Sequence, residues 1–151
     1  MRVGIVGNEG SKFTPEGKQK ALEAIAEILR PVDIKLMVSG HCHLGGIDIW
    51  AEEIADTLGI DKLIFPPKVQ SWEHGYKPRN LQIVENSDKV YCITVNKLPP
   101  EYKGMTFKEC YHCRRAGRDS TNHVKSGGCW TAFQAQKLGK QAEWIVVDNG
   151  V

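Results

Sequence analysis

The stretch Val3-Gly4-Ile5-Val6-Gly7 and the segment Thr14-Pro15-Glu16 that follows it decide the fold. Val3 to Val6 is a short apolar run, and it predicts a buried strand that ends at Gly7. Thr14-Pro15-Glu16 predicts the start of a helix, because threonine caps it, proline suits its first position and an acid suits its first turn. Pro31 ends this helix, whose apolar residues at helical spacing are Ala21, Leu22, Ile25, Ile28 and Leu29.

The same alternation of strand and helix continues to the end of the chain. Further strands are predicted over 33–38, 62–65, 90–95 and 144–147. Further helices are predicted over 47–58, 78–84 and 132–138. Strands that alternate with helices predict an α/β fold, here a Rossmann-like doubly wound parallel sheet of about five strands.

Two segments interrupt this alternation. Residues 66–77 have no apolar period, and we expect a loop. Its Trp72 and Tyr76 either stack on a base or cover the ligand cleft, or they only hold the loop in place. Residues 96–126 also lack a period and predict an inserted loop, with two cysteines, before the last helix. Long loops inside a compact domain usually serve a function. The length of 151 residues predicts a single domain, 1–151.

Composition argues against several classes of protein. The net charge is +2 and the lysines and arginines are scattered, so extended binding of nucleic acid is not expected. No apolar run approaches the roughly 20 residues of a membrane span, and the strand-like N-terminus does not resemble a signal peptide. Five cysteines, an odd number, favour a reducing, cytoplasmic setting in which cysteines are metal ligands or core residues.

The predicted topology gathers polar and glycine-rich loops at one edge of the sheet. The loops after the first, second and fourth strands all leave at the carboxyl ends of parallel strands, where such sheets bind their ligands. Before the last helix, the run from Ser126 to Thr131 combines hydroxyls with backbone amides and suits a phosphate. A tight turn without a ligand is the alternative. The predicted binding residues are Gly7, Asn8, Ser39, Gly40, Asp48, Arg79, Ser126, Gly127, Gly128 and Thr131.

Arg79 and Asp48 each have two interpretations. Arg79 lies just inside the helix predicted from Pro78, and its guanidinium either grips a phosphate or is a solvated surface group. Asp48 lies in the first turn of the helix over 47–58, where it either accepts a hydrogen bond from a ribose hydroxyl or stabilises the helix dipole. Neither the P-loop motif nor the glycine fingerprint of dinucleotide-binding domains is present.

Cys110 and Cys113, with His123 downstream, have the spacing of zinc ligands. A bound zinc ion would order an inserted loop that has little core of its own. Two unpaired thiols in a flexible loop are the alternative. A redox pair is not expected, because redox CxxC motifs open a helix and no helical pattern continues from Cys113. The candidates for a fourth ligand are water, His41, His112 and Cys129.

Several short motifs occur in an order that resembles the SLOG superfamily of Rossmann-like domains. The similarity is to the small stand-alone members, and more distantly to the LOG-type phosphoribohydrolases and the DprA/Smf proteins. It covers residues 1–97 and 126–151. The matching motifs are Val3-Gly4-Ile5-Val6-Gly7, Ser39-Gly40, Gly46-Ile47-Asp48, Arg79-Asn80, Ser87-Asp88-Lys89-Val90, Gly128 to Thr131 and Leu138-Gly139-Lys140.

The resemblance implies a nucleotide or phosphosugar ligand bound in part by Arg79, and a homodimer. LOG enzymes carry a glutamate for N-glycosidic cleavage at the position that matches Gln134, and a neutral amide cannot act as that acid or base. We therefore expect a nucleotide- or phosphosugar-nucleotide-binding domain with a zinc-stabilised loop, suited to sensing its ligand. The alternatives are an N-glycosidic-bond hydrolase that uses Asp48 or Glu73, and a DNA-associated protein.

Overall fold

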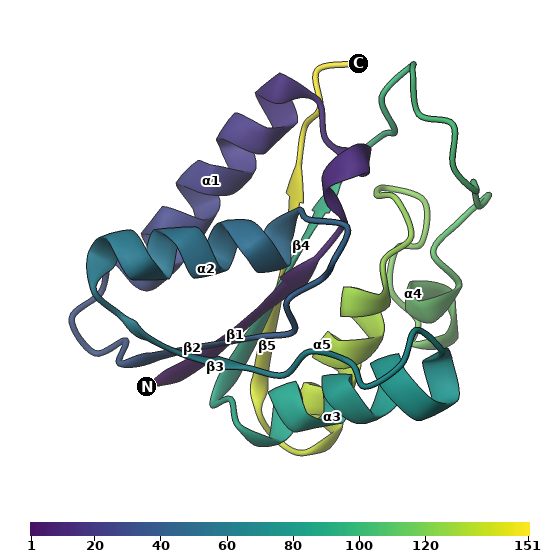
Figure 1. The fold of residues 1–151 in the computed structure, drawn as a ribbon. Coiled ribbons are helices and arrows are strands. Elements are labelled where there is room, and N and C mark those ends of the chain that lie inside the picture. The colour runs from purple at the N-terminus through teal and green to yellow at the C-terminus, as the bar shows by residue number, and fades with distance from the viewer.

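The computed structural model describes residues 1–151 as a five-stranded, all-parallel sheet flanked by helices (Figure 1). The strand order is β3-β2-β1-β4-β5, which confirms the predicted fold class. The strands are β1 (Arg2–Gly7), β2 (Leu36–Ser39), β3 (Asp61–Ile64), β4 (Lys89–Val95) and β5 (Gln141–Val147).

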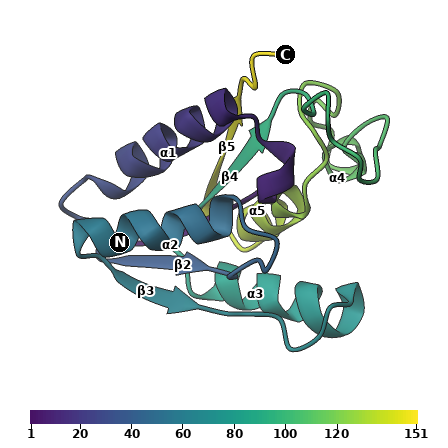
Figure 2. The ribbon, with the colours of Figure 1, turned by 45° about the horizontal axis from the view of Figure 1, so that its top comes forward.

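Two pairs of longer helices cover the two faces of the sheet (Figures 1 and 2). Helices α1 (Pro15–Leu29) and α2 (Ile47–Leu58) pack on one face. Helices α3 (Lys77–Glu85) and α5 (Gly127–Lys137) pack on the other. The predicted start of α1 is confirmed, since the Thr14 hydroxyl accepts a hydrogen bond from the Gly17 N–H. Gly59 ends α2 in a left-handed conformation, with φ of 70°.

The sheet divides the core in two because successive side chains of a strand point to opposite faces. On β1, Val3 and Ile5 pack under α1 and α2, whereas Val6 packs under α3 and α5. On β4, Ile93 joins the first core and Cys92 joins the second. Near-continuous burial of β1 and β4 is typical of central strands in a parallel sheet.

The strand order reverses between β1 and β4. From β1 the chain adds β2 and β3 on one side, and then returns to add β4 and β5 on the other. Ligands of such sheets bind at this switch point, outside the carboxyl ends of the strands. Asn8, the first residue after β1, bridges the point: its Oδ1 accepts from the Val95 N–H, and its Nδ2 donates to the Lys125 carbonyl oxygen.

Two predicted loops contain helical turns that the sequence pattern did not indicate. Residues 72–76 form one turn of π-helix (Trp72–Tyr76) that runs directly into α3, so α3 does not begin at Pro78. Gly75 makes this turn possible, because a Cβ there would overlap the Val69 carbonyl oxygen. In the inserted segment, α4 (Tyr111–Arg115) follows Cys110, so the expectation that no helix continues from this motif was wrong.

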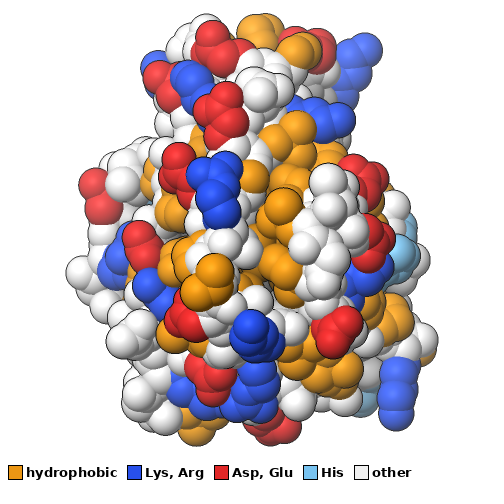
Figure 3. All heavy atoms as spheres, turned by 90° about the vertical axis from the view of Figure 1, so that its left-hand side faces the viewer, with side chains coloured by type: hydrophobic (Ala, Val, Ile, Leu, Met, Phe, Trp, Pro, Cys, Tyr) orange, Lys and Arg blue, Asp and Glu red, His pale blue; other side chains and the backbone are white.

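Charged side chains of both signs are interspersed on the face that Figure 3 shows, with apolar side chains between them. This pattern is typical of a solvated surface and offers no extended region of one sign on that face. No helix of the chain combines the length and the apolar character that a bilayer crossing requires.

Candidate functional site

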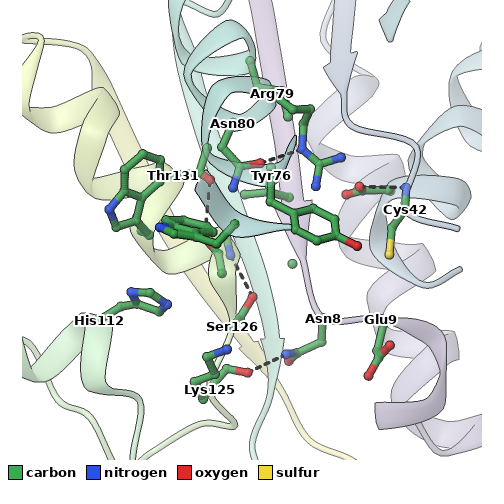
Figure 4. A pocket seen from close by; sticks show the side chains of 18 of the residues that line it. Asn8, Glu9, Cys42, Tyr76, Arg79, Asn80, His112, Lys125, Ser126 and Thr131 are labelled. Atoms are coloured by element: carbon green, nitrogen blue, oxygen red, sulfur yellow. Dashed lines mark hydrogen bonds between the residues drawn. The ribbon is translucent and has the colours of Figure 1, made fainter. Parts of the chain in front are cut away.

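A cavity of about 820 Å³ lies at the carboxyl ends of β1 and β4, where the strand order reverses. Figure 4 shows its labelled side chains converging from several elements: Asn8 and Cys42 come from the loops after β1 and β2, Arg79 from α3, and Ser126 from the residue before α5. Eight of the ten predicted binding residues line it: Gly7, Asn8, Asp48, Arg79, Ser126, Gly127, Gly128 and Thr131.

Ser39 and Gly40 do not line the cavity but support residues that do. The buried Ser39 hydroxyl donates to the Asp48 carbonyl oxygen at 3.4 Å. The Gly40 carbonyl oxygen accepts a hydrogen bond from Nη1 of Arg79. Both residues therefore lie behind the residues that line the cavity.

Arg79 is buried, with 8% of its surface exposed, yet it keeps most of its hydrogen-bonding capacity free. Its Nε donates to Asn80 Oδ1 at 2.7 Å and one Nη1 hydrogen goes to Gly40. A guanidinium carries five N–H groups, so three have no partner in the protein. The guanidinium carbon lies 5.5 Å from the centre of the Tyr76 ring. A buried arginine with free donors at a cavity wall can bind an anionic group.

The start of α5 forms another part of the cavity wall. Ser126 caps this helix, since its hydroxyl accepts from the Gly128 N–H at 3.0 Å. No acceptor is found for the Gly127 N–H, and a Cβ at Gly127 would meet open space. At Gly128 a Cβ would lie 3.0 Å from both Cys92 Sγ and the Gly7 nitrogen. The second glycine thus lets α5 press against β1, while the first leaves a free donor beside the cavity.

Asp48 is a buried carboxyl group in the first turn of α2. Its Oδ2 accepts from the Cys42 N–H at 3.1 Å, so the group holds the loop after β2 in place. Burial raises the pKa of Asp48 from 3.8 to about 6, although Arg79 and the Cys42 N–H act against this rise. A carboxyl with such a pKa can hold or release a proton near neutral pH.

Aromatic side chains form a further wall that sequence reasoning only partly anticipated. Trp72 and Trp130 lie edge to face with ring centres 5.0 Å apart, and His112 stacks obliquely on Tyr111 at 4.3 Å. All four line the cavity, as does Tyr76. The pattern gave no reason to group Tyr111 and His112 with Trp72, because only the fold of the inserted segment brings them together. Burial lowers the pKa of His112.

Basic groups outnumber acids around the cavity. Lys12, Arg79, Arg115 and Lys125 line it, against Glu9 and Asp48. Burial lowers the pKa of Lys12, while Glu9 nearby acts in the opposite direction. Lys125 and Arg115 both come from the inserted segment, in which the range 96–126 holds seven lysines and arginines and three acids. This excess of positive charge favours an anionic ligand.

A second constellation lies in the inserted segment next to α5. Cys110, Cys113, His123 and Cys129 are all buried, and their ligand atoms lie within 4.8 Å of one another, close enough to hold one metal ion. The three ligands predicted from the sequence are thereby brought together. Of the candidates for the fourth position, Cys129 completes the group, whereas His112 lines the ligand cavity instead.

Two distances within the group suit tetrahedral coordination. His123 Nε2 lies 3.4 Å from Cys113 Sγ and 3.6 Å from Cys129 Sγ. In a tetrahedral zinc site, bonds of about 2.3 Å to sulfur and 2.0–2.1 Å to nitrogen place such atoms about 3.5–3.6 Å apart. The other ring nitrogen, Nδ1, contacts Asn122 Oδ1 at 2.5 Å. A proton on Nδ1 leaves Nε2 free as a ligand, which is how metal-binding histidines are usually oriented.

Hydrogen bonding within the group moves the pKa values of its thiols apart. The pKa of Cys110 is lowered, chiefly by a hydrogen bond from Cys129 and also by one from His123. The pKa of Cys129 is raised, chiefly because it donates to Cys110. A thiolate is the form that binds a metal ion, so the low pKa of Cys110 favours binding. The pKa of His123 is raised, chiefly by its hydrogen bond to Cys110.

No family model, curated protein or solved structure matches the chain.

Proposed function

We propose that the chain is a nucleotide- or phosphosugar-nucleotide-binding domain whose inserted loop is stabilised by zinc. One observation carries the proposal: Arg79, with three free N–H groups, and the start of α5, with the free Gly127 N–H, line the same cavity at the switch point of the sheet. A phosphate is the group that uses an arginine fork together with a helix N-terminus.

The rest of the cavity suits the remainder of such a ligand. Its volume of about 820 Å³ lies within the range of about 300–1,000 Å³ that is usual for small-molecule sites. Trp72, Tyr76 and Trp130 offer aromatic surface for a base. The order of short motifs that resembles the SLOG superfamily supports the same ligand class.

Zinc is the ion that best fits the four-residue group. Three cysteines and one histidine, with ligand atoms within 4.8 Å of one another, match the donor set of structural zinc sites. With all four positions filled by protein, no position is open for substrate or water. The ion would act by holding the inserted segment together, and it would supply no reaction chemistry.

A second candidate, an N-glycosidic-bond hydrolase, is favoured by one observation. Asp48 lines the cavity beside Arg79 and has a pKa near 6, so it is an acid suited to proton transfer near neutral pH. Glu73 is an exposed residue outside the cavity lining, and Gln134 also lies outside it. Of Asp48 and Glu73, only Asp48 lines the cavity, which supports it as the acid of this candidate function.

Binding and catalysis are separated by one set of incubations. Zinc-loaded protein is titrated with nucleoside 5′-monophosphates and ribose 5-phosphate by calorimetry, and the same mixtures are followed for release of free base. Binding without base release supports a binding domain. Base release that Asp48→Asn abolishes supports the hydrolase. Absence of binding by every compound would reject both.

A further inference from the structure

Between Cys110 and Thr131, residues that line the cavity alternate along the chain with the four residues of the metal group. Tyr111 and His112 lie between Cys110 and Cys113. The run 125–128 lies between His123 and Cys129, and Trp130 and Thr131 follow Cys129 at once. An ion bound by the four ligands would therefore fix both ends of the segment that carries the free Gly127 N–H.

This part of the wall has almost no hydrophobic core to hold it. Between residues 100 and 125 only four residues are buried, and three of them are Cys110, Cys113 and His123 of the metal group. The fourth is His112, a cavity residue. α4 has only five residues, too few to be stable without tertiary contacts.

Few other bonds tie the segment to the sheet. The Val124 N–H donates to the Val95 carbonyl oxygen, and Asn8 donates to the carbonyl oxygen of Lys125. Both bonds lie next to the switch point, and neither reaches α4. Within the segment, the Cys110 N–H donates to the Ser120 carbonyl oxygen. The guanidinium of Arg118, just after α4, lies 3.9 Å from the centre of the Trp144 ring in β5. Apart from this contact, the position of α4 relative to α5 depends mainly on the metal group and on Trp72, which packs near both His112 and Trp130.

We propose that the metal centre is a positioning centre for the ligand cavity: a tetrahedral zinc-type ion that never touches the ligand but holds α4 and the start of α5 in binding geometry. The inference rests on the proposed function for the identity of the ligand, but its structural part does not. The metal site and the ligand cavity depend on the same ordered segment, so binding at the two sites is thermodynamically coupled. Bound metal must raise the affinity for ligand, and bound ligand must raise the affinity for metal by the same factor.

Hydrogen–deuterium exchange with and without zinc tests the structural part. Removal of zinc by a chelator is expected to raise exchange at least tenfold in 108–116 and 123–131, and to leave β1, β2 and α1 unchanged. Unchanged exchange in the two segments would overturn the proposal. If the metal-free chain unfolds as a whole, exchange rises everywhere, and the rate of zinc release from zinc-loaded protein decides.

The rate of zinc release to an excess of a chromogenic chelator tests the coupling. Saturating 5′-AMP or ribose 5-phosphate, whichever binds, is expected to slow release about fivefold or more. Arg79→Ala is the matched control, because it removes a ligand contact without touching the metal group, and it should abolish the slowing. Release at the same rate with bound ligand would overturn the coupling.

The two proposals fail in different ways. If neither compound binds, the proposed function fails, and the exchange experiment still decides whether zinc orders the wall. If ligand binds with equal affinity to zinc-loaded and zinc-free protein that retains its fold, the proposed function stands and the positioning role fails.

Discussion

The guanidinium of Arg79 lies directly against the backbone of Gly40, and its Nη1 donates to the Gly40 carbonyl oxygen at 2.5 Å. A Cβ at position 40 would overlap Nη1 of Arg79, and the nearest atoms to it all belong to this arginine. The loop after β2 thereby sets the position of a side chain on α3. The close approach, and not the backbone conformation, requires glycine at position 40. The φ of Gly40 is not positive, so alanine could adopt its backbone conformation.

Gly40→Ala is expected to displace Arg79 and so to weaken anion binding although residue 40 does not line the cavity. Overpacking of this kind costs about 1–3 kcal/mol in the free energy of unfolding. Urea denaturation measures the loss of stability, and calorimetry with 5′-AMP measures the loss of affinity. Unchanged values in both experiments would show that Arg79 is not held by this contact.

Substitution by alanine at the two adjacent glycines that start α5 should have different effects on stability. Gly128→Ala should destabilise the fold by about 1–3 kcal/mol, because a Cβ there lies 3.0 Å from Cys92 Sγ and from the Gly7 nitrogen. Gly127→Ala meets open space and should leave the free energy of unfolding within about 0.5 kcal/mol of the wild type. Thermal and urea denaturation of the pair provide the comparison, and equal losses would contradict the described packing of α5.

Asp48 should give the stability of the protein a specific pH dependence. Its folded-state pKa of about 6 exceeds the ordinary value of 3.8 because burial disfavours the charged form. The unfolded chain therefore loses this proton at lower pH than the folded chain. The resulting penalty is absent below about pH 4, grows as the pH rises to about 6, and reaches about 3 kcal/mol above that.

Asp48→Asn removes this titration and keeps an acceptor for the Cys42 N–H. The difference in unfolding free energy between variant and wild type should therefore shift in favour of the variant by up to about 3 kcal/mol between pH 4 and pH 7. Arg79, His41 and Glu52 also act on this carboxyl and are present in both proteins. Denaturation curves at intervals of half a pH unit measure the shift, and a difference that is constant across this range would disprove it.

The metal group predicts one equivalent of zinc per chain. Cys110→Ser and Cys129→Ser should each lower the zinc content and the melting temperature, because each removes one of four ligands. Cys42→Ser is the control, since Cys42 lies outside the group, and its zinc content should equal that of the wild type. Elemental analysis of the purified proteins gives the result. Negligible zinc in the wild type would reject the zinc assignment.

The fold could be predicted from the sequence because its signals are local. The apolar run at Val3 to Val6, the cap at Thr14 and the stop at Pro31 act within a few residues, and the structure places a strand and a helix within one or two residues of the expected bounds. The rule for parallel strands predicts which edge of the sheet carries the cavity. Eight of the ten predicted binding residues line the cavity at this edge.

The remaining features depend on contacts between distant segments. Cys129 is one of several candidates for the fourth ligand, and only the fold of the inserted segment singles it out by bringing it to Cys110 and Cys113. Ser39 and Gly40 share the composition of a ligand loop, yet the loop after β2 turns them behind the wall. The π-helical turn from Trp72 to Tyr76 depends on the close approach of Gly75 to Val69. The spacing of apolar residues in the sequence gives no sign of this contact.

The central claim is that Arg79 and the start of α5 bind one anionic ligand in a common cavity. Its most direct test is calorimetric titration of zinc-loaded wild type and Arg79→Ala with nucleoside 5′-monophosphates. Loss of charge-assisted hydrogen bonds should weaken binding in the variant by about 10- to 100-fold at unchanged zinc content. Equal affinity in the two proteins, or no binding of any nucleotide to the wild type, would contradict the account.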